Sequence, residues 1–377
     1  MNFPLEFQFL LLCVQPTLPA ERLRELAGAG LDWESFFALA ARHGVRPIVY
    51  ENLSKSCWDL VPPDVQQRWR EIGKAVGWQA FRAMGELLMI AAAFEKERVP
   101  VLPVKGPVLA QELYGSEALR EFGDLDLLVH EADFLKATAL LERLEYRTNW
   151  DVAPATKLQF LRYQGETGFT GLKSGLYVEL HWRIAKANDA LPLEPAFFWS
   201  RLRLVQFAGR ELLGFAPEPL ALFLAAQGGH DGWFDLRRVC DLAALVRKYP
   251  DVEWSAVLQE ASRLHGLRVL LLGLRLALEL LDAPLPEAVK KKIRDDPKLD
   301  ALAAQSLTAI MDPIYRYDFK RLVFQIQVKE GLWAKLRLAF GLLTDRTDHD
   351  GRWLMLPRAL WPLYRILRPL RRLRQAL

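Results

Sequence analysis

Cysteine is scarce in this chain of 377 residues. The three cysteines, Cys13, Cys57 and Cys240, are odd in number and far apart. They argue against a disulfide framework and favour reduced thiols in a cytoplasmic protein. No Cys-x-x-Cys pair occurs, so a zinc site of the usual spacing is not expected.

Long apolar runs are also missing. Residues 7–14 form a short apolar run, but no Lys or Arg precedes it and Glu6 adjoins it, which is unlike a secretory signal peptide. The most apolar later stretch, residues 269–281, contains Arg275 and Glu279 and is too short and too charged to span a bilayer. We therefore expect no transmembrane segment, and a buried helix at 269–281.

Acidic residues are absent from the C-terminal end. From Arg352 onward there are seven Arg and no Asp or Glu, whereas the whole chain carries a net charge of +4, so the rest sums to 4 − 7 = −3. Arg alternates with Leu, Trp and Tyr in this tail, which suits an anionic membrane surface or nucleic acid. Pro362 and Pro369 divide the tail, which favours a helix packed on the rest of the protein. The modest charge elsewhere argues against a long RNA substrate.

The chain contains ample material for a core, since 51% of its residues are hydrophobic. Its length favours two or three domains. Apolar spacing predicts helices within residues 20–48, broken near 28–30, and over about 63–96, followed by an α/β centre and a helical C-terminal part. The predicted strands of the centre are 99–104, 123–129, 167–171 and 176–182, and its predicted helices are 107–114 and 131–144. Further on, a hairpin is predicted at 202–207 and 211–215, and helices at 219–228, 234–248, 254–264, 267–282 and 298–311.

Two carboxylates occur in the predicted strand 123–129. Alternation places Asp124 and Asp126 on one face of it and Leu125 and Leu127 on the other. Asp is poorly suited to strands and the two like charges repel, so a bound divalent cation would compensate them. Mg²⁺ prefers carboxylate oxygens together with waters and substrate phosphates. An Asp-x-Asp pair by itself also fits a solvated strand edge.

A second acidic strand, residues 177–182, carries Glu179 and His181 on one face. If it lies beside the Asp strand, Glu179 completes a cluster of three carboxylates, which can hold two metal ions. His181 would then orient Glu179 or contact a nucleotide. The alternative is a half-buried histidine bonded to a backbone carbonyl.

Three motifs together resemble the DNA polymerase β-type nucleotidyltransferase superfamily, and within it a bacterial family of uncharacterised nucleotidyltransferases. They are residues 104–114 (VKGPVLAQELY), 120–129 (REFGDLDLLV) and 179–183 (ELHWR). Looser matches at 230–241 and 356–370 extend the resemblance along nearly the whole chain. It implies an α+β fold with a small mixed-sheet nucleotidyltransferase core at 97–186, an N-terminal helical region at 1–96, and a C-terminal helical domain with the basic tail at 187–377.

The resemblance also assigns the catalytic residues. Asp124 and Asp126 would be metal ligands for Mg²⁺ or Mn²⁺. Glu179 would be the third carboxylate, serving as a further metal ligand or as the base for an acceptor hydroxyl. Gly106 would let the backbone approach the phosphates at the N-terminus of the following helix.

The nucleotide-binding residues are expected around this cluster. Better-known members of the superfamily have Gly-Ser where this chain has Lys105-Gly106, and Pro107 removes one N–H donor. Lys105 would supply the lost attraction as a point charge. Arg120 and Arg183 are predicted to bind the triphosphate, together with His181, and a surface ion pair is the alternative for each arginine.

The implied activity is transfer of a nucleoside monophosphate from a nucleoside triphosphate (NTP) to a hydroxyl, with release of pyrophosphate. A small molecule or a protein is the favoured acceptor. Two alternatives remain: a nucleotide- or partner-binding module without turnover, which the altered turn favours, and a toxin- or antitoxin-type regulator that modifies a protein hydroxyl.

Overall fold

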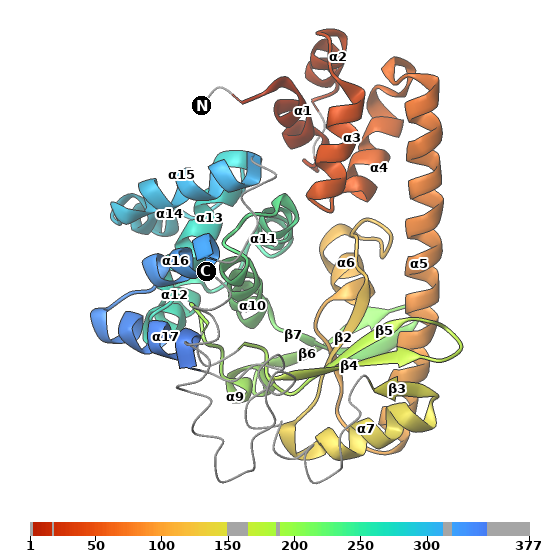
Figure 1. The fold of residues 1–377 in the computed structure, drawn as a ribbon, viewed down its shortest axis with the longest axis vertical. Helices are drawn as coiled ribbons and strands as arrows, with labels where there is room; N and C mark the ends of the chain where they lie inside the picture. Colours follow the sequence, from red (N-terminus) through yellow and green to blue (C-terminus); the bar gives the residue numbers. More distant parts are fainter. Residues whose placement is uncertain (1–2, 17–18, 149–164, 186–188, 312–318, 345–377) are drawn as a thin grey trace, which may run out of the picture.

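A small sheet stands between two helical regions in the sequence. In space it lies below the N-terminal helices and beside the C-terminal ones (Figure 1). A computed structural model describes residues 3–16, 19–148, 165–185, 189–311 and 319–344. The α+β class, with a mixed sheet and helices at both ends, is confirmed. The Arg-rich tail lies outside the described residues.

The N-terminal helices are α1 (Leu5–Cys13), α2 (Ala20–Gly28), α3 (Trp33–Arg42) and α4 (Arg46–Ser56), followed by the short 3-10 helix η1 (Trp58–Leu60). The apolar run that begins at Phe7 is part of α1, whose side chains are largely buried in a common core. The break expected near residues 28–30 separates α2 from α3. Asp32 caps α3 by accepting hydrogen bonds from the backbone N–H groups of Glu34 and Ser35.

Helix α5 (Pro63–Lys96) has 34 residues and is therefore about 51 Å long. Its first half packs against the N-terminal helices through Val65 and Trp69. Its second half covers the sheet through Leu87, Ile90 and Phe94. One helix thus runs from the N-terminal region to the sheet (Figure 1).

The central sheet has the order β1-β2-β5-β4-β3. Its strands are β1 (Leu102–Pro103), β2 (Asp124–Leu128), β3 (Tyr146–Thr148), β4 (Glu166–Gly171) and β5 (Tyr177–His181), with α6 (Gly106–Tyr114), η2 (Glu131–Asp133) and α7 (Phe134–Arg143) between them. Strands β2 and β5 are parallel and the other pairs are antiparallel. The predicted hairpin forms β4 and β5, whereas β3 was not predicted.

The C-terminal region begins with α9 (Pro195–Trp199) and the hairpin of β6 (Leu202–Phe207) and β7 (Arg210–Phe215). The helices that follow are α10 (Pro217–His230), α11 (Leu236–Lys248), α12 (Trp254–Arg263), α13 (Leu267–Leu281), α14 (Glu287–Arg294), α15 (Lys298–Met311), α16 (Phe319–Val328) and α17 (Leu332–Thr344). The predicted hairpin and helices are confirmed, and α9, α14, α16 and α17 are additional. The predicted burial of 269–281 is also confirmed, since most side chains of α13 are buried. Within the described ranges, no helix combines the length and the apolar character needed to cross a membrane.

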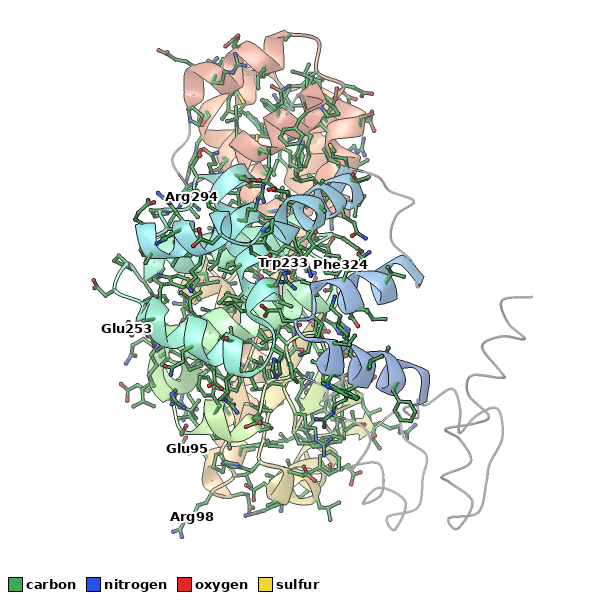
Figure 2. The ribbon with its side chains drawn as sticks, turned by 90° about the vertical axis from the view of Figure 1, so that its left-hand side faces the viewer. Glu95, Arg98, Trp233, Glu253, Arg294 and Phe324 are labelled. Carbon is green, nitrogen blue, oxygen red and sulfur yellow. The ribbon has the colours of Figure 1, made fainter. Side chains whose placement is uncertain are left out.

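Large aromatic side chains fill the C-terminal core. The Trp233 indole is fully buried, and its ring occupies space left by Gly228 and Gly273, which have no side chain. Trp233 and Phe324 lie inside this region, whereas Glu253 and Arg294 project outward (Figure 2).

The apolar core of the sheet draws on all three predicted regions. It includes the second half of α5, the inward face of the sheet with α7, and Val205, Phe207 and Leu212 of the β6–β7 hairpin. Side chains from both sides of the boundaries predicted at residues 96/97 and 186/187 pack together in this core. The division into domains stays a prediction.

Candidate active site

Strands β2 and β5 place the predicted carboxylates side by side. The two strands pair in parallel, with Asp126 directly opposite Glu179. Their alternation sends Leu125, Leu127, Val178 and Leu180 into the core beneath α5 and α7. The other face of the sheet carries Asp124, Asp126, Glu179 and His181, and the condition for a three-carboxylate cluster is met.

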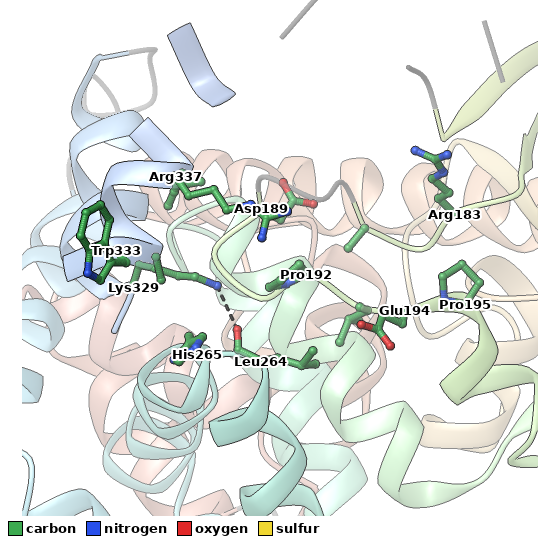
Figure 3. Close-up of a pocket in the computed structure, with 14 residues that line it drawn as sticks. Arg183, Asp189, Pro192, Glu194, Pro195, Leu264, His265, Lys329, Trp333 and Arg337 are labelled. Atoms are coloured by element: carbon green, nitrogen blue, oxygen red, sulfur yellow. Dashed lines mark hydrogen bonds between the residues drawn. The ribbon is translucent and has the colours of Figure 1, made fainter. Parts of the chain in front are cut away.

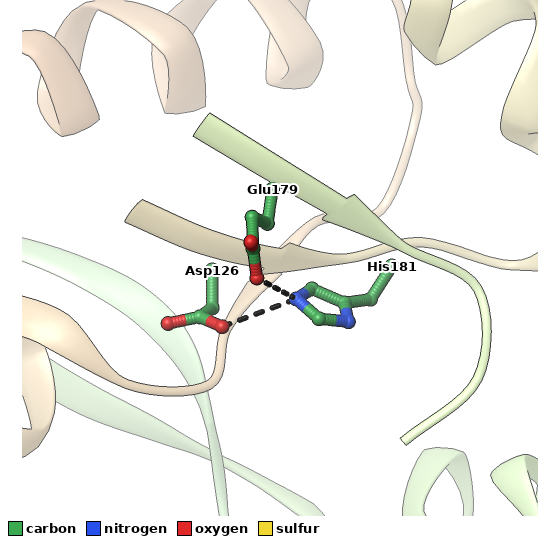
Figure 4. Close-up of side chains that lie close together, drawn as sticks. All are labelled: Asp126, Glu179 and His181. Atoms are coloured by element: carbon green, nitrogen blue, oxygen red, sulfur yellow. Dashed lines mark hydrogen bonds and ion pairs between the residues drawn. The ribbon is translucent and has the colours of Figure 1, made fainter. Parts of the chain in front are cut away.

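Asp126 lies at the centre of this polar face, and its side chain is only 2% exposed. Its Oδ1 accepts a hydrogen bond from Lys105 Nζ at 2.9 Å and lies 3.1 Å from His181 Nε2. The same His181 nitrogen is 3.5 Å from Glu179 Oε2, and Nδ1 is 3.2 Å from Glu166 Oε2. Figure 4 shows the Asp126 and Glu179 carboxylates approaching the same imidazole nitrogen.

The surroundings of His181 favour its positively charged form. Burial by itself would lower the pKa of His181, but its hydrogen bonds to Asp126, Glu166 and Glu179 raise the pKa well above the ordinary value. Because carboxylates face both ring nitrogens, the doubly protonated ring can donate from each. The backbone-carbonyl contact considered for His181 is replaced here by contacts with carboxylates.

The two aspartates respond differently to this environment. Burial would raise the pKa of Asp126, but the nearby Lys105 ammonium and His181 imidazolium lower it well below its usual range. Burial raises the pKa of Asp124, and the charges of Asp126 and Glu179 raise it further, with Lys105 and His181 acting in the opposite direction. The ionised form of Asp124 is therefore less favourable here than in water.

The donor set suits a divalent cation. Ligand atoms of Asp126, Glu179 and His181 all lie within 4.8 Å of one another. Asp124 is outside that group but close enough to interact electrostatically with all three of its members. Carboxylate oxygens suit Mg²⁺ and Mn²⁺, and the His181 nitrogen could join them as a ligand only when the ring is neutral. The residues present therefore fit a metal site.

The Lys105–Gly106 turn lies against β2. The Val104 N–H donates to the Asp126 carbonyl at 3.0 Å, which holds Lys105 beside the cluster. Gly106 begins α6 with φ of 65°, and a Cβ there would be 3.5 Å from the carbonyl oxygen of Asp124. The left-handed backbone explains why glycine occupies this position. Phosphate binding by the turn stays a prediction.

Arg120 is buried in an ion pair. Its Nε lies 3.0 and 3.1 Å from the two carboxylate oxygens of Asp241, and its Nη2 lies 3.0 Å from Oδ2. The Tyr114 hydroxyl donates to Oδ1 of the same carboxylate at 2.8 Å. Asp241 lies on α11, so this cluster fastens the segment that leads into β2 to the C-terminal helices. Nucleotide binding by Arg120 stays a prediction, although Arg120 is near enough to interact electrostatically with Asp126.

Arg183 follows the end of β5 and is one-third exposed. Its Nη2 lies 3.6 Å from Glu131 Oε2, which matches the ion-pair alternative without testing a role in nucleotide binding. Trp182, the residue before it, is buried with its ring against Phe134. His230 lies 3.1 Å from Asp189, away from the carboxylate cluster.

Glu166 was missed from the sequence. It lies opposite His181 in the β4–β5 pair. Its carboxylate therefore reaches the imidazole from β4, on the side of β5 away from β2. The predicted hairpin contained the signal, because a turn across residues 173–175 and antiparallel pairing bring residue 166 opposite residue 181. The predicted strand began one residue too late to include it.

A sheet face with clustered carboxylates, beside a glycine turn at a helix N-terminus, is suited to binding a metal ion with a phosphorylated ligand. A family model described as an uncharacterised nucleotidyltransferase matches residues 29–282, which is more than half of the chain. The chain therefore belongs to this nucleotidyltransferase family, whose activity class is nucleotidyl transfer. A search of curated proteins found no match.

Proposed function

We propose that the chain is a Mg²⁺- or Mn²⁺-dependent nucleotidyltransferase of the DNA polymerase β-type superfamily. It transfers a nucleoside monophosphate from an NTP to a hydroxyl group and releases pyrophosphate. The observation that carries this proposal is the pairing of Asp126 with Glu179 on the polar face of the sheet, with Asp124 beside them, in a member of a nucleotidyltransferase family.

Asp124, Asp126 and Glu179 would hold the metal. A bound metal would neutralise phosphate charge and make the acceptor hydroxyl more acidic. Burial and the charges of Asp126 and Glu179 raise the pKa of Asp124, and a bound cation would act in the opposite direction. Lys105 and His181 are the cations that balance Asp126 in the structure.

Glu179 is the carboxylate best placed to act on the acceptor. Its side chain is 29% exposed, whereas that of Asp126 is 2% exposed, so a hydroxyl group can reach it. As the hydroxyl oxygen forms its bond to the α-phosphorus, Glu179 accepts the hydroxyl proton. The bond from the α-phosphorus to the bridging oxygen breaks, and pyrophosphate leaves.

Lys105 and the start of α6 would hold the triphosphate. The Lys105 ammonium already bonds to Asp126, so a phosphate beside Asp126 lies within its reach. The first backbone N–H groups of a helix attract anions. Catalysis then rests on positioning and charge compensation, which need few side chains.

The test is calorimetric titration with a non-hydrolysable ATP analogue, with and without Mg²⁺. We expect Mg²⁺-dependent binding by the wild type and about tenfold or greater weakening in Asp124→Asn and Asp126→Asn, since each loses a charged ligand. Glu145→Gln, which alters an exposed carboxylate outside the cluster, is the matched control. Equal Mg²⁺-dependent binding by wild type and both aspartate variants would place the metal elsewhere.

A binding module without turnover is the second candidate. It is favoured by the Lys105-Gly106-Pro107 turn, which lacks the Ser and one N–H donor of better-known members. Incubating the protein with α-labelled NTPs and cell extract separates the two, because a transferase labels an acceptor and releases pyrophosphate. A labelled protein band would indicate a regulator that modifies a protein hydroxyl, and a labelled small molecule would indicate a metabolic enzyme.

A further inference from the structure

A pocket of about 530 Å³ opens at the end of β5. It is lined by Arg183 after the strand, by the segment around Asp189 and Pro192, by the α12–α13 junction at His265, and by Lys329 and Trp333 before and on α17. Arg183 and Trp333 lie at opposite ends of it (Figure 3). Its volume falls within the roughly 300–1,000 Å³ of pockets that hold small molecules.

The pocket lies next to the carboxylate cluster. Arg183 is two residues beyond His181, a separation of roughly 7 Å along an extended chain. The backbone N–H groups of Trp182 and Arg183 both donate to the Gly165 carbonyl, at 2.8 and 3.1 Å. Gly165 precedes Glu166, whose carboxylate contacts His181.

The pocket and the Lys105 turn lie at opposite ends of the paired strands. Val104 bonds to Asp126, so Lys105 is beside the first half of β2. His181 pairs with Leu128 at the end of β2, so Arg183 lies beyond that end. An NTP held at Lys105 and a second ligand held in the pocket would approach the carboxylates from different sides.

Lys329 supplies a buried positive charge to the pocket. Its side chain donates to the carbonyls of Ala190 and Leu264 at 2.9 and 3.0 Å, and Figure 3 shows the second of these bonds. An ammonium has three N–H donors, so one remains for a ligand. Burial lowers the pKa of Lys329 to about 8, which Glu330 and Asp189 oppose and Arg337 reinforces.

Arg337, an exposed residue of α17, adds a second cation to the lining of the pocket. Over the ranges that the structure describes, its guanidinium makes no hydrogen bond or ion pair. The carboxylates of the pocket are already engaged, because Asp189 contacts His230 at 3.1 Å and Glu194 contacts Arg263 at 3.5 Å. The Arg337 guanidinium and the third N–H of Lys329 can therefore form strong, charge-assisted hydrogen bonds with an anion.

We infer that this pocket is the acceptor subsite, and that it takes a small organic molecule with a hydroxyl group and a phosphate or carboxylate group. Lys329 and Arg337 hold the anionic group, the exposed ring of Trp333 offers an apolar surface beside it, and the hydroxyl lies toward Arg183 and Glu179. The assignment of the pocket to the acceptor rests on the proposed nucleotidyl transfer. The predicted binding of the anion does not depend on it.

The test is calorimetric titration with sn-glycerol 3-phosphate, D-glycerate and neutral glycerol, without Mg²⁺ or nucleotide. We expect at least one of the two anions to bind and glycerol not to bind. The anion that binds more tightly identifies the preferred anionic group. Arg337→Gln and Lys329→Met should each weaken binding about tenfold or more, because each removes a charged donor. Lys335→Gln removes the same charge from the same helix outside the pocket lining and should leave binding within about twofold of wild type.

The outcomes of these titrations separate this inference from the proposed function. Asp126→Asn should still bind the anion but should no longer bind the ATP analogue in the presence of Mg²⁺. If the wild type binds the anion but not the analogue, only the proposed function is overturned. No anion binding by the wild type, or equal binding by Arg337→Gln and Lys335→Gln, would overturn the subsite. Weakened binding of the ATP analogue by Arg337→Gln would assign the pocket to the nucleotide and also overturn it.

Discussion

Removing the charge of Asp241 should strongly destabilise the protein. The Arg120 and Asp241 side chains are 4% and 1% exposed, and Asp241→Asn leaves the guanidinium buried without its counter-charge. Breaking a buried pair from one side costs about 3–5 kcal/mol. This is a large part of the roughly 5–15 kcal/mol that stabilises a typical protein.

The assay is equilibrium urea unfolding, with Arg143→Gln as the control. Arg143 pairs with Glu97 on the surface, where the two side chains are 64% and 36% exposed, and such a pair contributes only about 0–1 kcal/mol. The contrast isolates burial, since each variant removes one charge from one ion pair. A cost of Asp241→Asn no larger than that of Arg143→Gln would refute this reasoning.

The double variant Arg120→Met/Asp241→Leu should recover most of the lost stability, because a buried pair replaced by apolar side chains is often neutral. About 1 kcal/mol should stay lost, since the Tyr114 hydroxyl loses its acceptor. The same variant tests the predicted nucleotide role of Arg120. Stable protein that still binds the ATP analogue would make Arg120 structural, and stable protein without binding would show that its charge helps to hold the triphosphate.

Three further predictions concern single positions. Because the folded-state pKa of His181 is raised, its stabilising contribution should be complete below pH 6.5 and lost as the pH rises through the folded pKa. Urea unfolding of wild type and His181→Gln over neutral to alkaline pH checks this. A difference in unfolding free energy between the two proteins that grows with pH would contradict it. Gly106→Ala should cost about 1–2 kcal/mol in the same assay, because φ is 65° there, and an unchanged midpoint would contradict the left-handed turn. Gly273→Ala should cost about 1–3 kcal/mol in thermal unfolding, because its Cβ would lie 2.1 Å from the Trp233 ring; Gly85→Ala on α5, with open space around it, should be neutral or slightly stabilising.

The placement of the main carboxylates was predictable from local pattern. Strand alternation is a property of consecutive residues, so the common face of Asp124 and Asp126, and that of Glu179 and His181, could be read from the sequence. Whether the two strands lie side by side could not be read from local pattern. The structure pairs them with Asp126 opposite Glu179.

Long-range partners were not predictable from such patterns. Arg120 and Asp241 are 121 positions apart, and no local signal tells a buried paired arginine from an exposed one. The acceptor pocket is a similar case, because it joins residues between 183 and 338 of the chain. Nothing in the sequence around Lys329 indicates that its side chain is buried, and only the fold reveals this.

Short elements were missed for a different reason. Strand β3 has three residues and α9 has five, too few for a period of two or 3.6 to be recognised. Their positions depend on what they pack against. The Tyr146 side chain of β3 is buried in the core of the sheet, and Phe198 of α9 is buried in the core of the helical regions.

The length of α5 determines how the protein can be divided into fragments. A fragment that began at residue 97 would expose the sheet surface that Leu87, Ile90 and Phe94 cover, and it would be prone to aggregation. A fragment that ended at residue 96 would leave those same side chains in water. A cut between residues 60 and 63 would preserve the cover of the sheet, but it would expose Val65 and Trp69 instead. We therefore expect soluble expression to require the N-terminal helices, α5 and the sheet in one polypeptide.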